Sequence, residues 1–270
     1  MRKTMLCTAL GLILAGSAPV EASPCVDIAL VLAVDSSGSI DDSEYAFQKS
    51  AISHAFRDEA VISVLRDAGT VAVSAVFWGD AMFPTQNVGW FVVNHGEGAE
   101  SFAREIDGNR RAVFGNTDIG NGIWAVLDLL ALSNLCPRRS IIDISGDGRE
   151  ARRSGRSPDI SLYDARQRAR QMGVRINALV VSDERGDLVN YYAKEVILGP
   201  GSFVMSVKSH ADYAAALKKK LIRELAFEAT EQAPGGNHAG AAVLERTPVH
   251  MVIGAIPSSV STAPASAPNP

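Results

Sequence analysis

The chain has 270 residues, 47% apolar and 21% charged, which is typical of a protein with one folded domain of about 200 residues and additional segments. Its formal net charge of −4 excludes the basic surplus of a general nucleic-acid-binding protein. After the N-terminal region, no apolar run approaches the ~20 residues of a transmembrane helix, so no membrane span is predicted.

Residues 1–22 have the pattern of a cleaved secretory signal peptide. Arg2 and Lys3 precede the apolar run 5–15, and small residues follow around Ala22. Cleavage removes two cationic side chains and one acidic one, which leaves a formal charge of −5. We therefore expect an exported protein that is periplasmic or secreted.

Two cysteines remain after this segment, Cys25 and Cys136. Paired cysteines in an oxidising compartment form disulfides by default. Each cysteine lies just before an apolar run typical of a strand, and parallel neighbouring strands would place both thiols at one edge of a sheet. We predict a disulfide between Cys25 and Cys136.

Strands and helices are predicted to alternate through most of the remaining chain. Apolar runs predict strands over 28–34, 70–78, 86–93, 140–145, 174–181 and 203–207. Helical spacing predicts helices over 45–56, 60–66, 98–106, 122–132, 159–172, 188–196 and 211–228. The third strand follows the second through a short turn, so it is expected to be an antiparallel edge strand. The pattern predicts an α/β fold, Rossmann-like and doubly wound, with a mostly parallel sheet and helices on both faces.

The composition changes near residue 229. Half of the twelve prolines fall in the last 37 residues, mixed with Ala, Ser, Thr and Gly. We therefore predict a folded domain over residues 23–228 and a disordered tail over residues 229–270.

Oxygen-bearing side chains gather at three separated places in the chain. Asp35, Ser37 and Ser39 directly follow the first strand. Thr117 lies in the loop that enters a helix, and Asp147 follows the strand over 140–145. Loops at the carboxyl ends of the strands of an open α/β sheet converge on one ligand site. Hydroxyl and carboxylate oxygens suit a small divalent cation, although each piece alone also fits a turn or a helix cap.

In this order, Asp-x-Ser-x-Ser, a distant Thr and a strand ending in Gly-Asp-Gly resemble the von Willebrand factor type A (vWA) domain and its metal-ion-dependent adhesion site (MIDAS). The resemblance spans roughly residues 26–226, and segments 142–148 and 199–204 resemble a bacterial branch of exported vWA proteins without an assigned function. It implies Mg²⁺ or Mn²⁺, with Ser37 and Ser39 bound directly, Thr117 directly or through water, and Asp35 and Asp147 mainly through water. One coordination position then stays open for a carboxylate of a partner protein.

Two basic loops lie near these residues in the sequence. The arginines concerned are Arg110, Arg111, Arg149, Arg152, Arg153 and Arg156. Guanidinium groups steer and clamp acidic ligands, although arginine-rich loops are also common on solvated surfaces. We treat the six as candidate partner-binding residues.

Asp143 lies inside a strand that is expected to be buried. A buried carboxylate without a partner is costly. We therefore expect it to pair with an arginine or a hydroxyl group of a neighbouring element rather than to act in catalysis.

Enzymatic functions fit the motifs less well. Haloacid-dehalogenase-type phosphatases begin with Asp-x-Asp, whereas this chain has Ser37 at the second position, so the proton-transfer partner is absent. The Gly-x-Ser-x-Gly and Gly-x-Gly-x-x-Gly fingerprints are also missing. We predict a non-enzymatic, metal-dependent, adhesion-type module whose partner offers an acidic residue. The alternative is a cell-envelope scaffolding protein that binds its partner independently of the metal, and a hydrolase is less favoured.

Overall fold

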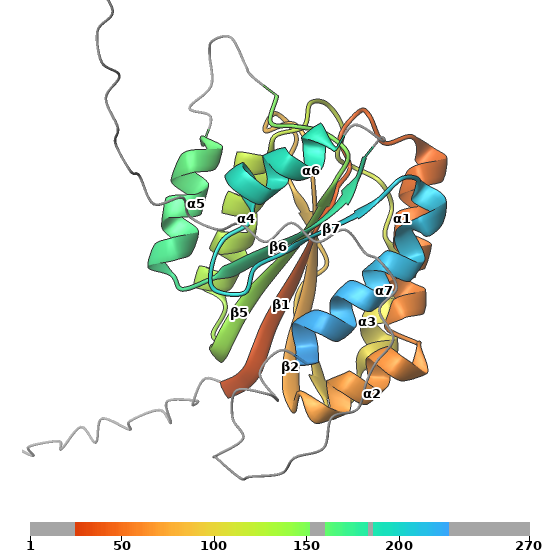
Figure 1. Cartoon of the computed structure of the whole chain (residues 1–270). Helices are drawn as coiled ribbons and strands as arrows, with labels where there is room; N and C mark the ends of the chain where they lie inside the picture. Colours follow the sequence, from red (N-terminus) through yellow and green to blue (C-terminus); the bar gives the residue numbers. More distant parts are fainter. Residues whose placement is uncertain (1–24, 152–159, 183–185, 227–270) are drawn as a thin grey trace, which may run out of the picture.

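The computed structural model describes residues 25–151, 160–182 and 186–226 (Figure 1). The predicted signal peptide and the predicted tail lie outside the described residues. Seven strands form one sheet in the order β3-β2-β1-β5-β6-β7, with β4 also paired to β2. Their bounds are β1 Cys25–Asp35, β2 Thr70–Trp78, β3 Gln86–Asn87, β4 Phe91–Asn94, β5 Cys136–Gly146, β6 Arg175–Val181 and β7 Val204–Val207.

The central strands are parallel, and the strands that pair antiparallel lie at the β2 edge. β1 pairs in parallel with β2 and with β5, and β6 joins β5 to β7 in the same sense. The single edge strand predicted over 86–93 is instead two short strands, β3 and β4, which both pair antiparallel with β2. Gly89 between them has φ of +77°, a left-handed conformation that interrupts an extended strand.

Helices cover both faces of the sheet (Figure 1). One face carries α1 Asp42–Ala55, α2 Glu59–Asp67, α3 Ala99–Gly108 and α7 His210–Ala226. The other carries α4 Ile119–Leu132, α5 Leu162–Gln171, α6 Asp187–Tyr191 and the π-helical turn η1 Tyr192–Val196. Each face has its own apolar core, so the predicted doubly wound α/β fold is confirmed. Within the described residues, no helix has the length and hydropathy needed to cross a membrane.

The predicted disulfide is present in the structure. Cys25 and Cys136 are Cα partners at the amino ends of β1 and β5, 4.5 Å apart, and their sulfur atoms are bonded. The bond closes a loop between residues 111 positions apart. A loop of this size corresponds to a stabilisation of about 4 to 5 kcal/mol when only chain entropy is counted.

A charged network lies buried between β5, β6 and α7. Asp143 is 3% exposed and forms an ion pair with Lys220, which is fully buried. The same ammonium group lies 2.7 Å from Glu224, and the Asn177 side chain donates to that carboxylate at 2.8 Å. Burial, reinforced by the charge of Asp143, raises the pKa of Glu224 to about 8. Asp143 thus has a partner from a neighbouring element, but it is a lysine rather than the expected arginine or hydroxyl group.

Replacing Lys220 with Met should lower the free energy of unfolding by about 3 to 5 kcal/mol, because two buried carboxyl groups lose their shared cation. The matched control, Lys219→Met, alters an exposed lysine of the same helix and should change the free energy of unfolding by less than about 0.5 kcal/mol. Urea unfolding measures both values. Adding Asp143→Asn and Glu224→Gln to Lys220→Met should restore much of the lost stability. Equal effects of Lys220→Met and Lys219→Met would show that Lys220 does not stabilise the two buried carboxyl groups.

Candidate metal centre

The loop after β1, the segment that leads into α4 and the loop after β5 meet at the carboxyl end of the sheet. They lie beside the switch point between β1 and β5, where the strand order changes direction. Short backbone hydrogen bonds hold the loop after β1 in place. The Ser36 amide donates to the Trp78 carbonyl at 2.7 Å, and the Gly38 amide donates to the Gly115 carbonyl at 2.6 Å. The loop after β1 is therefore held both to the end of β2 and to the segment that leads into α4. Open α/β sheets bind ligands at this position.

The structure brings together all five residues predicted as metal ligands. The Ser37 hydroxyl oxygen lies 3.2 Å from that of Ser39 and 3.2 Å from that of Thr117. The Ser39 hydroxyl donates to Asp147 at 2.7 Å, and the Ser37 amide donates to Asp35 at 2.8 Å. Three hydroxyl groups and two carboxyl groups thus form one contiguous cluster.

Asp35 is the buried carboxyl group of this cluster. It is fully buried, and its Oδ2 atom has no hydrogen-bond partner within the described residues. Burial raises the pKa of Asp35 to about 7, and the negative charge of Asp147 adds to this effect. A buried polar atom without a partner costs about 1 to 3 kcal/mol, so this carboxylate favours a cation.

The donor set fits a hard divalent cation. Within the described part of the chain, no three His, Cys, Asp or Glu side chains are grouped so that they could hold a metal ion. The cluster instead consists of hydroxyl and carboxyl oxygens, which suit Mg²⁺ or Mn²⁺.

Two glycines allow the loops to approach this closely. A Cβ atom on Gly148 would lie 2.8 Å from the Thr117 hydroxyl oxygen. A Cβ atom on Gly115, which has φ of +90°, would lie 2.3 Å from the Asp80 side chain. The glycine that follows Asp147 is therefore needed to place this carboxylate beside Thr117.

Arg111 points into the loop after β1 instead of into solvent. Its side chain is 11% exposed, and Nη2 donates to the carbonyls of Ser36, Ser37 and Ile40 at 3.1, 3.0 and 2.7 Å. Its Nη1 atom pairs with Asp42 at 2.8 Å. Arg111 therefore shapes the loop after β1, a role that the sequence prediction did not include. A basic residue six positions before Thr117 gave no signal that could distinguish it from its neighbour Arg110, which is exposed.

Two tyrosines, also not predicted, hold the loop after β5. Tyr192 of η1 is buried, and its hydroxyl donates to the Gly148 carbonyl at 3.0 Å. The Tyr191 hydroxyl accepts from the Glu150 amide at 3.3 Å. Burial, together with the nearby charge of Asp35, raises the pKa of Tyr192 well above its usual value, so it remains a neutral donor.

The remaining candidate arginines belong to the loop after β5. Arg149 is exposed, lies over the Tyr191 ring at 5.1 Å and donates to the Asp187 carbonyl at 3.1 Å. Arg152, Arg153 and Arg156 lie outside the described residues.

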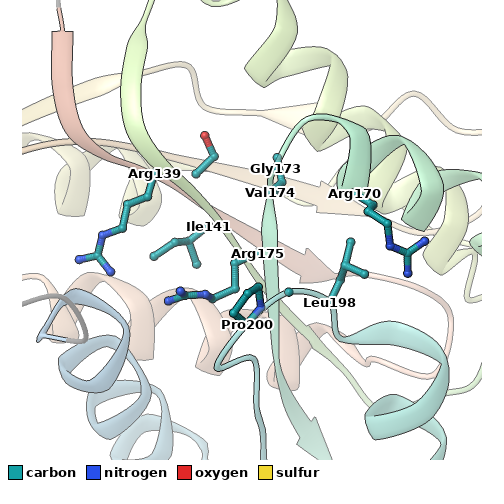
Figure 2. A pocket seen from close by; sticks show the side chains of 10 residues that line it. Arg139, Ile141, Arg170, Gly173, Val174, Arg175, Leu198 and Pro200 are labelled. Atoms are coloured by element: carbon teal, nitrogen blue, oxygen red, sulfur yellow. The ribbon is translucent and has the colours of Figure 1, made fainter. Parts of the chain in front are cut away.

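Two cavities mark opposite ends of the sheet. One of about 610 Å³ adjoins the oxygen cluster and is lined by Asp147, Gly148, Arg149, Val181, Ser182, Asp187 and Leu188. The other, about 390 Å³, lies at the amino ends of β5 and β6, where Arg139, Ile141 and Arg175 lie near Pro200 (Figure 2). Arg139 there donates to the carbonyls of Glu224 and Leu225 in α7. The second cavity shares no lining residue with the oxygen cluster.

Residues 25–229 match a family described as "Protein of unknown function (DUF1194)". The chain belongs to this family. No curated protein sequence matches it.

Solved structures share its fold at low sequence identity. Proximal thread matrix protein 1 from the mussel byssus, with a zinc-occupied MIDAS motif, is 18% identical over 76% of this chain and 49% of its own, with a TM-score of 0.51. The D319A mutant of the PilB minor pilin from Streptococcus sanguinis is 13% identical over 80% and 65%, with a TM-score of 0.52. The pilus adhesin SpaC from Lactobacillus rhamnosus GG, in its open conformation, is 14% identical over 76% and 31%, with a TM-score of 0.51. The chain spans about half the length of the mussel protein. These likenesses support a vWA-like fold.

Replacing Arg111 with Lys should destabilise the domain by about 2 to 4 kcal/mol, because a single ammonium nitrogen cannot reach the three carbonyls and the Asp42 carboxylate at the same time. The matched control, Arg110→Lys, changes an exposed neighbour and should have little effect. Thermal or urea unfolding of both variants checks the difference. Equal stability of the two variants would show that the contacts of Arg111 do not hold the loop.

Proposed function

We propose that this protein is an exported, adhesion-type binding module in which a divalent cation, Mg²⁺ or Mn²⁺, captures a carboxylate of a partner protein. The observation that carries the proposal is the convergence of three hydroxyl groups around Ser37, next to the buried Asp35 carboxylate that lacks a partner for one oxygen. The residues that would hold the cation are Asp35, Ser37, Ser39, Thr117 and Asp147.

The charges of these residues explain why an acidic ligand is expected. The cluster has only two carboxyl groups, so their negative charge would about equal the positive charge of a divalent cation. No surplus negative charge would surround the cation and repel an acidic ligand. The hydroxyl groups of Ser37, Ser39 and Thr117 supply neutral oxygen ligands, and Mg²⁺ readily keeps exchangeable waters. When bound, the cation supplies the positive charge that attracts a carboxylate in place of one of those waters.

Other observations support this type of module. One structural neighbour has a zinc-occupied MIDAS motif, and two others are a pilus adhesin and a minor pilin. The Cys25–Cys136 disulfide fits an oxidising compartment, as does the signal peptide predicted over residues 1–22. These features favour a binding protein outside the cytoplasm over an enzyme.

Positive charge near the cluster fits an acidic partner. Arg149 is exposed directly after the Asp147-Gly148 turn, and Arg110 is exposed next to Arg111. We propose that these two arginines, together with Arg152, Arg153 and Arg156 of the same loop as Arg149, steer an acidic partner toward the cation. Arg111 remains in this set as a proposal, although most of its donors serve the loop.

The mature protein should bind Mg²⁺ and Mn²⁺ when either ion is present at millimolar concentration or below. Asp35→Ala or Ser37→Ala should weaken this binding at least tenfold, because each substitution removes an oxygen of the cluster. Isothermal titration calorimetry, or electron paramagnetic resonance with Mn²⁺, measures the affinity. Ser43→Ala, which alters an exposed hydroxyl group in the first turn of α1, is the control and should bind as the wild type does. Failure of the wild type to bind either ion at millimolar concentration would overturn the proposed function.

The second candidate is a cell-envelope scaffolding protein whose partner does not need the metal. It is favoured by the cavity of about 390 Å³ that lies at the other end of the sheet from the cluster (Figure 2). Affinity capture from an extract of exported proteins, with Mg²⁺ and with EDTA, separates the two functions. We expect a partner that is lost on chelation and lost with Ser37→Ala. A partner that is retained in EDTA would favour the scaffold.

A further inference from the structure

An exposed group of hydrophobic side chains lies beside the metal cluster. Met82 is 81% exposed, Phe83 is 41% exposed and Phe114 is 40% exposed. The two phenylalanine rings face each other edge-on, with centroids 6.2 Å apart. We call these three residues the apolar patch.

The patch is continuous with the loop after β1. Phe114 precedes Gly115, whose carbonyl accepts the 2.6 Å hydrogen bond from Gly38. The Arg111 guanidinium lies 4.6 Å from the centre of the Phe114 ring while it donates to the Ser37 carbonyl at 3.0 Å. A single side chain therefore contacts both the patch and the backbone of a proposed metal ligand.

Buried polar contacts fix the loop that carries Met82 and Phe83. The Asp80 carboxylate, 6% exposed, accepts from the Met82 amide at 2.8 Å and from the Asn116 side chain at 2.9 Å. The Phe83 amide donates to the Asp80 carbonyl at 2.9 Å. Asn116 directly precedes Thr117, so the same contacts also tie the patch to the metal cluster. The hydrophobic side chains are thus held at the surface by a loop that hydrogen bonds to Asp80 keep in one conformation.

We propose that the apolar patch is the second half of the partner site. The occupant is a protein segment in which an acidic residue, bound at the cation, adjoins a bulky apolar residue that packs on Met82, Phe83 and Phe114. The inference rests on the proposed function and adds the chemical class of the ligand. Met and Phe are enriched in the buried centres of protein interfaces, and Met adapts to partners of different shape.

There is a physical reason to combine a cation that binds a carboxylate with a patch that binds an apolar side chain. Water competes with a single carboxylate for an exposed cation, so this contact alone gives weak binding. Partial burial of one aromatic side chain adds about tenfold in affinity. The two halves of the site therefore select an acidic residue with an apolar neighbour over an isolated acidic residue.

Three synthetic peptides test the proposal: Gly-Phe-Asp-Phe-Gly, Gly-Gly-Asp-Gly-Gly and Gly-Phe-Asn-Phe-Gly, each blocked at both ends. Binding to the mature protein is followed by NMR of ¹³C-methyl methionine, with the Met82 signal assigned from Met82→Leu. With Mg²⁺, the Phe-Asp-Phe peptide should bind about tenfold more tightly than the Gly-Asp-Gly peptide and shift the Met82 signal. EDTA should abolish the binding of both, and the Phe-Asn-Phe peptide should not bind.

Two variants test whether the tighter binding of the Phe-Asp-Phe peptide depends on the apolar patch. Phe83→Ser should remove most of the tenfold advantage without changing the Mg²⁺ affinity. Leu132→Ser, the matched control at the end of α4, alters a side chain that is 84% exposed and should retain the advantage.

The other outcomes separate the two proposals. Equal Mg²⁺-dependent binding of the two Asp peptides, or an advantage that survives Phe83→Ser, would overturn the patch and leave the proposed function standing. Binding of the Phe-Asn-Phe peptide as tightly as the Phe-Asp-Phe peptide would overturn the two-part site. Failure of the protein to bind Mg²⁺ itself would overturn both proposals.

Discussion

The parallel pairing of β1 with β5 is the constraint on which the rest of the structure depends. Its register sets Cys25 opposite Cys136 at one end and Val34 opposite Ser145 at the other. The same register therefore creates the disulfide and brings the loop of Asp35 beside the loop of Asp147. Because side chains alternate between the faces of a strand, a shift by one residue would move every core side chain of β1 to the opposite face. The covalent bond at the amino ends thus supports the geometry of the oxygen cluster at the carboxyl ends.

Much of the fold and the central oxygen cluster could be predicted because both depend on local patterns. Strands buried on both faces appear as continuous apolar runs, and parallel strands place their carboxyl ends at one edge. Asp35, Ser37, Ser39 and Asp147 directly follow such strands, so their convergence with Thr117 follows from topology. The disulfide follows from the same reasoning, since each cysteine lies at the start of a central strand.

The remaining features depend on contacts between distant segments or on single backbone conformations. The positive φ of Gly89 divides the expected edge strand, but the sequence does not show which glycine adopts that conformation. Arg111 and Tyr192 hold the loops after β1 and β5 through backbone carbonyls, and any residue can supply a carbonyl. Lys220 lies in a helix with several lysines, and only packing shows that this one is buried beside Asp143.

The contrast between Asp143 and Asp35 is informative about the function. Both carboxyl groups are buried and belong to neighbouring central strands. Each carboxyl group has one oxygen without a hydrogen-bond partner within the described residues. The fold supplies Asp143 with the ammonium group of Lys220, whereas within the described residues no cationic side chain forms an ion pair with Asp35. A protein that can bury a lysine beside one carboxylate could do the same for the other. The Asp35 environment instead contains three hydroxyl groups that can face a cation, so the missing positive charge is best supplied from outside the chain.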